Sequence, residues 1–124
     1  LCMQWLPYED LIAHASEELV LQYNPNWSGA GERKHPIAIA EEWLDDFTVT
    51  HQMECDLDVP FTRESWNGRI KACRGIGASL PPEEIAAWET EHLQLLERIA
   101  PESFTIRHYA ALAELTKKSK KEVE

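Results

Sequence analysis

The chain has 124 residues, 44% of them hydrophobic and five of them tryptophan, which is enough for one domain with a packed core. Its formal net charge of −10 argues against nucleic acid as a partner, because a phosphate backbone is bound through surplus lysine and arginine. No segment is apolar and long enough for a signal peptide or a membrane span. The cysteines lack C-x-x-C spacing, which indicates free thiols in a reducing cytoplasm rather than disulfides: Cys2, Cys55 and Cys73.

The first half of the chain predicts one strand and one long helix. Residues 1–5 form a short apolar run, which we interpret as the end of a buried strand whose first part lies upstream. Apolar positions recur at helical spacing over residues 8–23. Residues 24–36 are rich in Gly, Asn and Pro and predict a loop, and residues 37–46 are expected to add a short helix.

The second half predicts two long strands separated by two helices. Residues 47–59 alternate between apolar and polar side chains, which is typical of a strand with one buried face. Thr62 is expected to cap a helix that Gly75 ends, residues 82–99 form another helix, and residues 104–112 alternate again. We therefore expect an α/β fold whose antiparallel strand pair closes the edge of a sheet that begins upstream.

Two patterns that suggest ligand binding are better explained by structure. Gly29-Ala30-Gly31 and Gly75-Ile76-Gly77 follow a loop and a helix rather than a strand, so we interpret them as turn and cap glycines and not as a phosphate loop. His51, Cys55 and His108 would share a sheet face and could bind zinc, but an imidazole and a thiol on a core face are more often simply packed. We expect no metal site.

Two aromatic regions are candidates for a substrate site. Residues 61–75 hold four basic residues and one acid in a strongly acidic protein, and Trp66 and Arg69 fall on adjacent helical turns. Such a pair can present a flat ring and a carboxylate-binding fork, or Trp66 can be core beneath a solvated basic face. Trp5 and Tyr8 follow the first strand, where open α/β sheets bind ligands, although both rings can also pack on the helix.

Four segments resemble the C-terminal half of bacterial class I S-adenosylmethionine-dependent methyltransferases of the type-11-like group. They cover nearly the whole chain, and the most specific is the W-x-G-R-I-x-A-C-x-G-x-G-A-S-L block at residues 66–80. The other stretches are MQWLPYEDLIAHASEELVLQYNPNWSGAG, EEIAAWETEHLQLL and IAPESFTIRHYAALAEL. One departure is Pro81, where a capping serine would be expected.

The resemblance implies a doubly wound, Rossmann-like sheet of seven strands whose last strand runs antiparallel. Residues 1–5 would end the fourth strand, residues 47–59 and 104–115 would be the closing strands, and residues 66–80 would belong to an insert over the substrate side. The cofactor loop and the ribose-binding acid would lie on strands that this chain lacks. Only Met3 and Gln4, with Trp5, match the stretch beside the methionine end of the cofactor.

The resemblance therefore implies an S-adenosylmethionine-dependent methyltransferase of small molecules, present here as a fragment without its cofactor-binding half. In that reading Arg63 and Arg69 anchor an acidic substrate, and His108 is the one acid-base candidate. The methyl-transfer site would be walled by Trp5, Tyr8 and Trp66. We expect this chain alone to be inactive and to bind the cofactor weakly.

The alternative is a non-catalytic α+β binding module that dimerises through its open sheet edge. In both readings residues 1–116 are the domain. Residues 117–124 carry the lysine block and are expected to be a solvated, charged tail.

Overall fold

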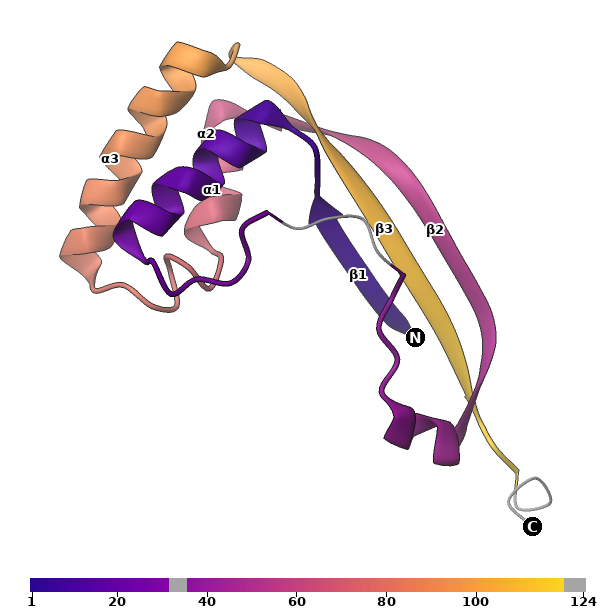
Figure 1. Ribbon diagram of the computed structural model, residues 1–124. Helices are drawn as coiled ribbons and strands as arrows, with labels where there is room; N and C mark the ends of the chain where they lie inside the picture. Colours follow the sequence, from indigo (N-terminus) through magenta and orange to yellow (C-terminus); the bar gives the residue numbers. More distant parts are fainter. Residues whose placement is uncertain (32–35, 120–124) are drawn as a thin grey trace.

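The computed structural model describes residues 1–31 and 36–119. It is an α/β chain in which three α-helices gather at one end of a long, twisted three-stranded sheet (Figure 1). The elements in chain order are β1 (Cys2–Pro7), α1 (Leu11–Tyr23), the 3-10 helix η1 (Glu41–Asp45), β2 (Phe47–Thr62), α2 (Arg63–Lys71), α3 (Pro82–Ile99) and β3 (Ser103–Lys117).

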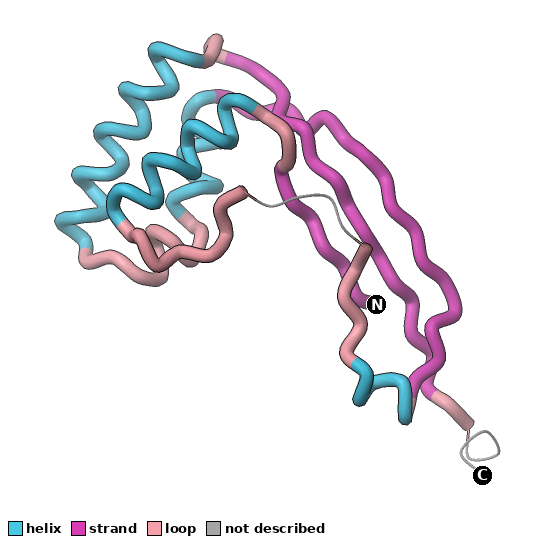
Figure 2. Tube along the Cα trace, viewed as in Figure 1, coloured by secondary structure: helices cyan, strands magenta, loops and turns pink. Residues whose placement is uncertain are grey.

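The sheet has the strand order β1-β3-β2, with the last strand in the middle. β3 runs antiparallel to both neighbours, so β1 and β2 are parallel to each other. The expected long antiparallel pair is confirmed, since β2 and β3 pair from Phe47–Lys117 to Thr62–Ser103. Within the described residues, the outer edges of β1 and β2 pair with no further strand, as Figure 2 shows.

The even alternation expected of β2 is broken near its start. Val49 pairs with Leu115, but His51 pairs with Glu114, so Thr50 is the extra residue of a bulge. Residues before the bulge therefore face the opposite side of the sheet from the one that unbroken alternation predicted. A single inserted residue leaves the two flanking segments alternating as before, and this is why the sequence pattern does not reveal it.

The helices cover only the end of the sheet where they connect to it. There β3 contributes Ile106, and the helices and their loops contribute the other fully buried large apolar side chains: Val20, Trp66, Ile76, Trp88 and Leu96. Further along, the same face is open. By cross-strand pairing this open sheet face carries Met3, Trp5, Met53, Cys55 and Leu57. Met3 is 65% exposed and Met53 is 48% exposed, so the predicted buried face of β2 is only partly buried.

Helix boundaries follow their caps. The first helix begins at Leu11 rather than at residue 8, because the carboxylate of Asp10 accepts the Ala13 N–H at 2.9 Å. The expected cap at Thr62 is confirmed and forms a capping box with Ser65.

The predicted range of α3 is confirmed, and the predicted end of α2 is wrong. α2 ends at Lys71, before the Gly75 that we expected to close it. α3 occupies the predicted range and starts without a side-chain cap at Pro81, as the departure from the resemblance suggested.

The lysine block begins inside the fold. Lys117 is the last residue of β3, and the Lys118 N–H donates to the Asp46 carbonyl at 2.8 Å. Lys120 and Lys121 lie outside the described residues.

Replacing the cap of α2 should weaken the fold measurably. Thr62→Ala removes the acceptor for the Ser65 N–H, and we expect it to lower the free energy of unfolding in urea by about 1 kcal/mol. Thr105→Ala is the matched control, since Thr105 is also an exposed strand threonine but makes no cap. Equal losses in the two variants would show that the cap contributes nothing beyond strand propensity.

Candidate functional site

Four of the predicted substrate residues meet where β1, β2, β3 and α2 come together. The Trp5 ring lies 5.3 Å from the His108 ring, and His108 stacks at 6.1 Å on Phe61. Phe61 packs edge-on against Trp66 at 5.0 Å, and the Arg69 guanidinium lies over Trp66 at 5.3 Å. We call these five residues the aromatic cluster. Four of these residues were predicted from the sequence as separate substrate-binding candidates. Phe61 was not predicted, although it continues the alternation of β2.

The sheet register assembles this cluster. His108 pairs with Pro7 at the end of β1 and with Leu57 within β2, which brings both outer strands beside it. α2 follows β2 without a loop, so the capping box fixes where Trp66 and Arg69 lie relative to the sheet. Their spacing of three places them on adjacent turns of one helix face.

His108 is fully buried, and only one of its two ring nitrogens is hydrogen-bonded among the described residues. Its Nδ1 lies 3.0 Å from the Ile106 carbonyl, which can only accept, so Nδ1 carries the proton and Nε2 presents a lone pair. Among the described residues, Nε2 has no hydrogen-bond partner. Burial lowers the pKa of His108, and the charge of Arg69 lowers it further, while the Ile106 carbonyl and Asp10 act in the opposite direction. The imidazole is therefore a neutral acceptor at neutral pH.

Arg69 is half-buried, and its burial lowers the pKa of its guanidinium, an effect that Cys73 and Glu17 oppose. Within residues 1–31 and 36–119 the guanidinium makes no hydrogen bond and no ion pair. It makes a cation–π contact with the Trp66 ring instead. Arg69 is thus a half-buried cation without a hydrogen-bond acceptor among the described residues.

Arg63, which we expected to anchor a substrate, makes two hydrogen bonds within the fold. Its Nε and Nη2 donate to the Ala100 carbonyl at 3.0 and 2.6 Å, which satisfies a free carbonyl at the end of α3. The guanidinium therefore connects the first residue of α2 to the C-terminal end of α3 by hydrogen bonds. Spacing in the sequence cannot reveal such a contact, because 37 residues separate the partners.

Trp66 is core, which is the alternative left open above. It is fully buried, and its Nε1 donates to Ser16 Oγ at 2.9 Å. It supports the cluster from beneath and carries Arg69 on its face. The accessible ring of the cluster is Trp5, which is 40% exposed.

Tyr8 lies apart from the cluster. Its ring packs edge-on against Tyr109 at 5.6 Å, and Tyr109 is on the sheet face opposite His108 because neighbouring strand residues alternate. Arg107 lies over the Tyr8 ring at 5.8 Å. Tyr8 also borders a cavity of about 420 Å³ between the end of β1 and α1, together with Glu9, whose φ of +47° is unusual for a residue other than glycine.

The two expected cofactor contacts lie on β1. Met3 is exposed on the open sheet face, opposite Leu112 of β3, and Gln4 pairs with Ala111.

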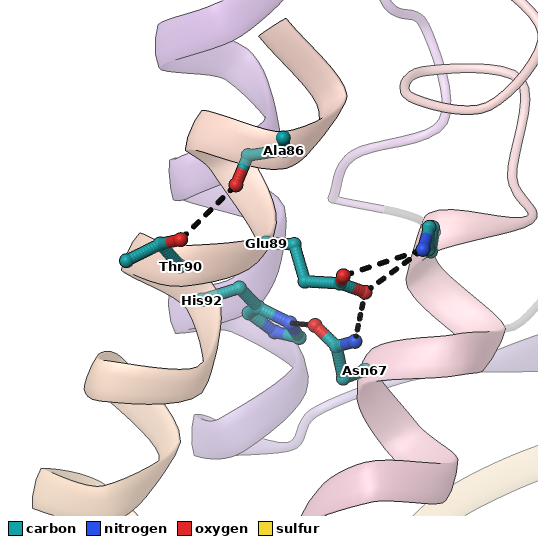
Figure 3. A network of polar contacts seen from close by, with 6 residues as sticks. Asn67, Ala86, Glu89, Thr90 and His92 are labelled. Carbon is teal, nitrogen blue, oxygen red and sulfur yellow. Dashed lines mark hydrogen bonds and ion pairs between the residues drawn. The ribbon is translucent and has the colours of Figure 1, made fainter. Parts of the chain in front are cut away.

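A second polar network, which the sequence did not predict, joins α2 to α3 (Figure 3) and reaches α1 through Ser16. His92 Nδ1 lies 2.9 Å from Asn67 Oδ1, and His92 Nε2 lies 2.9 Å from Ser16 Oγ. Asn67 in turn donates to Glu89 at 2.8 Å, and Glu89 pairs with Lys71 at 3.1 Å. These contacts lower the pKa of the Glu89 carboxyl. Because the Asn67 oxygen can only accept, the proton of His92 is on Nδ1, and Nε2 accepts from the Ser16 hydroxyl.

Other binding chemistries find little support. No three His, Cys, Asp or Glu side chains of the described residues are grouped so that they could hold a metal ion. Gly75 is buried, and a Cβ there would lie 2.7 Å from Val20 and 2.9 Å from Trp27, so close packing requires this glycine. No helix in the described part of the chain is long and apolar enough to cross a bilayer.

Acid should destabilise the protein through its buried histidines. Burial lowers the pKa of His92 to about 4, so between pH 6.5 and 4 the unfolded chain takes up a proton that the folded chain excludes. Stability should therefore be unaffected by His92 above pH 6.5 and fall by about 3 kcal/mol towards pH 4. The lowered pKa of His108 adds loss in the same direction.

Urea unfolding between pH 4 and 7.5 measures this slope. His92→Gln should flatten it, whereas Gln94→Ala, which removes an exposed side chain without a titratable group from the same helix, should leave it unchanged. An unaltered slope in His92→Gln would contradict the neutral, buried state of His92.

No protein family, curated protein or solved structure matches this chain in sequence or fold comparison. The methyltransferase resemblance therefore rests on the residues quoted above, and the function is inferred from them together with the geometry of the cluster.

Proposed function

We propose that this chain is the substrate-side half of an S-adenosylmethionine-dependent methyltransferase that acts on a small molecule. The observation that carries the proposal is the order of the sheet. The last described strand, β3, runs antiparallel to both of its neighbours, and the resemblance implies a sheet whose last strand is antiparallel.

The open edge of β1 supports the same proposal. In a doubly wound sheet the strands continue on both sides of the first crossover, and helices cover both faces. β1 offers an unpaired edge, and the open sheet face offers uncovered apolar side chains. An upstream half would supply the pairing strand and the missing cover.

The aromatic cluster is the proposed substrate side. It lies at the carboxyl end of β1, where open α/β sheets bind their ligands. S-adenosylmethionine, when bound to the complete enzyme, supplies an activated methyl group. The residues of this chain would orient the substrate and exclude water, which is how proximity accelerates a transfer between two bound groups. His108 Nε2, which is buried and has no hydrogen-bond partner among the described residues, is the proposed acceptor of a proton or a hydrogen bond from the substrate.

The fit of the cofactor to this chain is partial. Met3 is exposed beside the cluster and suits an apolar contact with the methionine end, and Gln4 follows it on the same strand. Among the described residues neither glycine pair follows a strand, so neither has the setting of a phosphate-binding loop. The groups that bind the ribose and the adenine of the cofactor would belong to the upstream half.

Calorimetry and intact mass test the proposal together. Titrating S-adenosylmethionine into the 124-residue chain should give no micromolar binding heat, because the ribose-binding groups are missing. The native polypeptide from its source cells should have roughly twice the 14.3 kDa mass of this chain, as a two-half domain requires, and should bind the cofactor. Micromolar binding by the chain alone, or a native mass of 14.3 kDa, would overturn the proposal.

A non-catalytic module that dimerises through its open sheet edge is the second candidate, and the outer edges of β1 and β2, which pair with no further described strand, favour it. The edge strand β2 also carries Leu57, an apolar side chain that is 38% exposed. If this reading holds, light scattering should show a dimer, and Leu57→Glu should convert it to a monomer. Leu11→Glu is the control, since Leu11 is 88% exposed and lies on α1. A monomer at all concentrations, with a cooperative melt, would exclude the module.

A further inference from the structure

The outer edge of β2 is long and pairs with no other strand in the described part of the chain. The strand has 16 residues, and residues 50–58 are exposed throughout. Its backbone N–H and C=O groups that point away from β3 form a template to which another strand can add. The bulge at Thr50 and the ring of Pro60, which has no N–H, bound the regular stretch of this edge and limit the registers in which a strand can pair with it.

Charged side chains are segregated along this edge on one face of the sheet. Glu54, Asp56 and Asp58 share a face of β2 in the half nearest the helices. By register Lys117 of β3 lies on the same face at the far end, beside Phe47, because the bulge turns the start of β2 to this side. Glu54, Asp58 and Lys117 form no ion pair with any described residue of their own copy.

Apolar surface is segregated between the same two ends. At the far end (Figure 1), η1 and the first residue of β2 expose Trp43 by 40%, Leu44 by 42% and Phe47 by 36%. At the end near the helices, an open hollow of about 520 Å³ is lined by Phe61 and Phe104 and otherwise by proline, serine and threonine side chains. Its lining residues at positions 60 and 105 lie on the face that carries the acids.

Antiparallel pairing of two β2 edges brings both complementary pairs of features together. A twofold axis perpendicular to the sheet keeps the same face of both copies on one side and lays the far end of each β2 beside the near half of the other. With the axis at Met53, Gln52 lies opposite Glu54 of the second copy, so no acid of this face lies opposite another acid.

This register also brings the lysine and the apolar tip of each copy to their counterparts. Phe47 lies beside Asp58 of the second copy, and Lys117, on the next strand, is two strand spacings or about 10 Å from the same aspartate. Trp43 and Leu44, which precede Phe47, lie beside the hollow of the second copy. Each contact occurs twice, because the axis relates the two copies.

We propose that two copies of this chain pair antiparallel through the outer edge of β2, with the twofold axis at Met53, into one continuous sheet. The pairing goes beyond both candidate functions, because β1 and not β2 offers the edge at which an upstream half would pair. It is therefore open to the complete methyltransferase as well as to a stand-alone module.

Disulfide cross-linking at the axis tests the register. In a Cys55→Ser background, Met53→Cys places two thiols directly opposite each other, where a Cα separation of about 4.5–5.5 Å suits a disulfide. Mild oxidation should convert this variant to a covalent dimer. Leu57→Cys in the same background is the matched control, since its two thiols would lie roughly 25 Å apart along the paired strands and should cross-link at least about tenfold more slowly.

Charge exchange tests the contacts. Lys117→Glu, and separately Asp58→Lys, should raise the dimer dissociation constant in sedimentation equilibrium about tenfold, because each replaces two symmetric attractions by repulsions. The double variant exchanges the two charges and should restore most of the affinity. Arg74→Glu is the control: it changes the net charge as Lys117→Glu does, at an exposed position in the loop after α2, and should leave the dissociation constant unchanged.

Two results would overturn the proposal. One is a chain that stays monomeric at all concentrations, which needs no variant. The other is equal cross-linking of the Met53→Cys and Leu57→Cys proteins. A complete, cofactor-binding enzyme that is monomeric would leave the proposed methyltransferase function intact and remove the β2 interface; a complete protein that pairs through β2 but does not bind the cofactor would do the reverse.

Discussion

The hydrogen-bond chain from Trp66 through Ser16 to His92 is the constraint on which the helical end of this molecule depends. Each of the three groups comes from a different helix, and all three are fully buried. Burying an indole N–H, a hydroxyl and an imidazole is costly unless they bond to one another, so these contacts favour the observed packing of the three helices. Trp66 also carries Phe61 and Arg69 on its ring, and the position of the aromatic cluster follows from the same constraint.

Helices and strands whose signals are local could be predicted from the sequence. The bounds of α3 follow from its amphipathic stripe and the prolines at either end, and Thr62 was recognisable as a cap because capping depends on residues three positions apart. The long strand pair was visible in its alternation. What could not be predicted was the bulge at Thr50, since it changes pairing without changing composition.

The site was predicted in part for the same reason. Trp5, Arg69 and His108 each stood out as residue types, and the sheet register brings them together. The roles of Arg63 and Trp66 depend on partners far away in sequence, Ala100 and Ser16, and such contacts have no local signature. The network around Asn67 was missed because a buried amide on a helix looks like any surface polar residue until its neighbours are known.

The uneven cover of the sheet divides the chain into two zones of different mechanical character. Near the helices, strand residues such as Ile106 are locked by packing on every side. Beyond them β2 and β3 continue as a ribbon held chiefly by its own ladder (Figure 1), and we expect amide hydrogens there to exchange through local opening rather than global unfolding. The part of the sheet with the most surface to offer a neighbour is thus also the part that can adjust its twist to meet one.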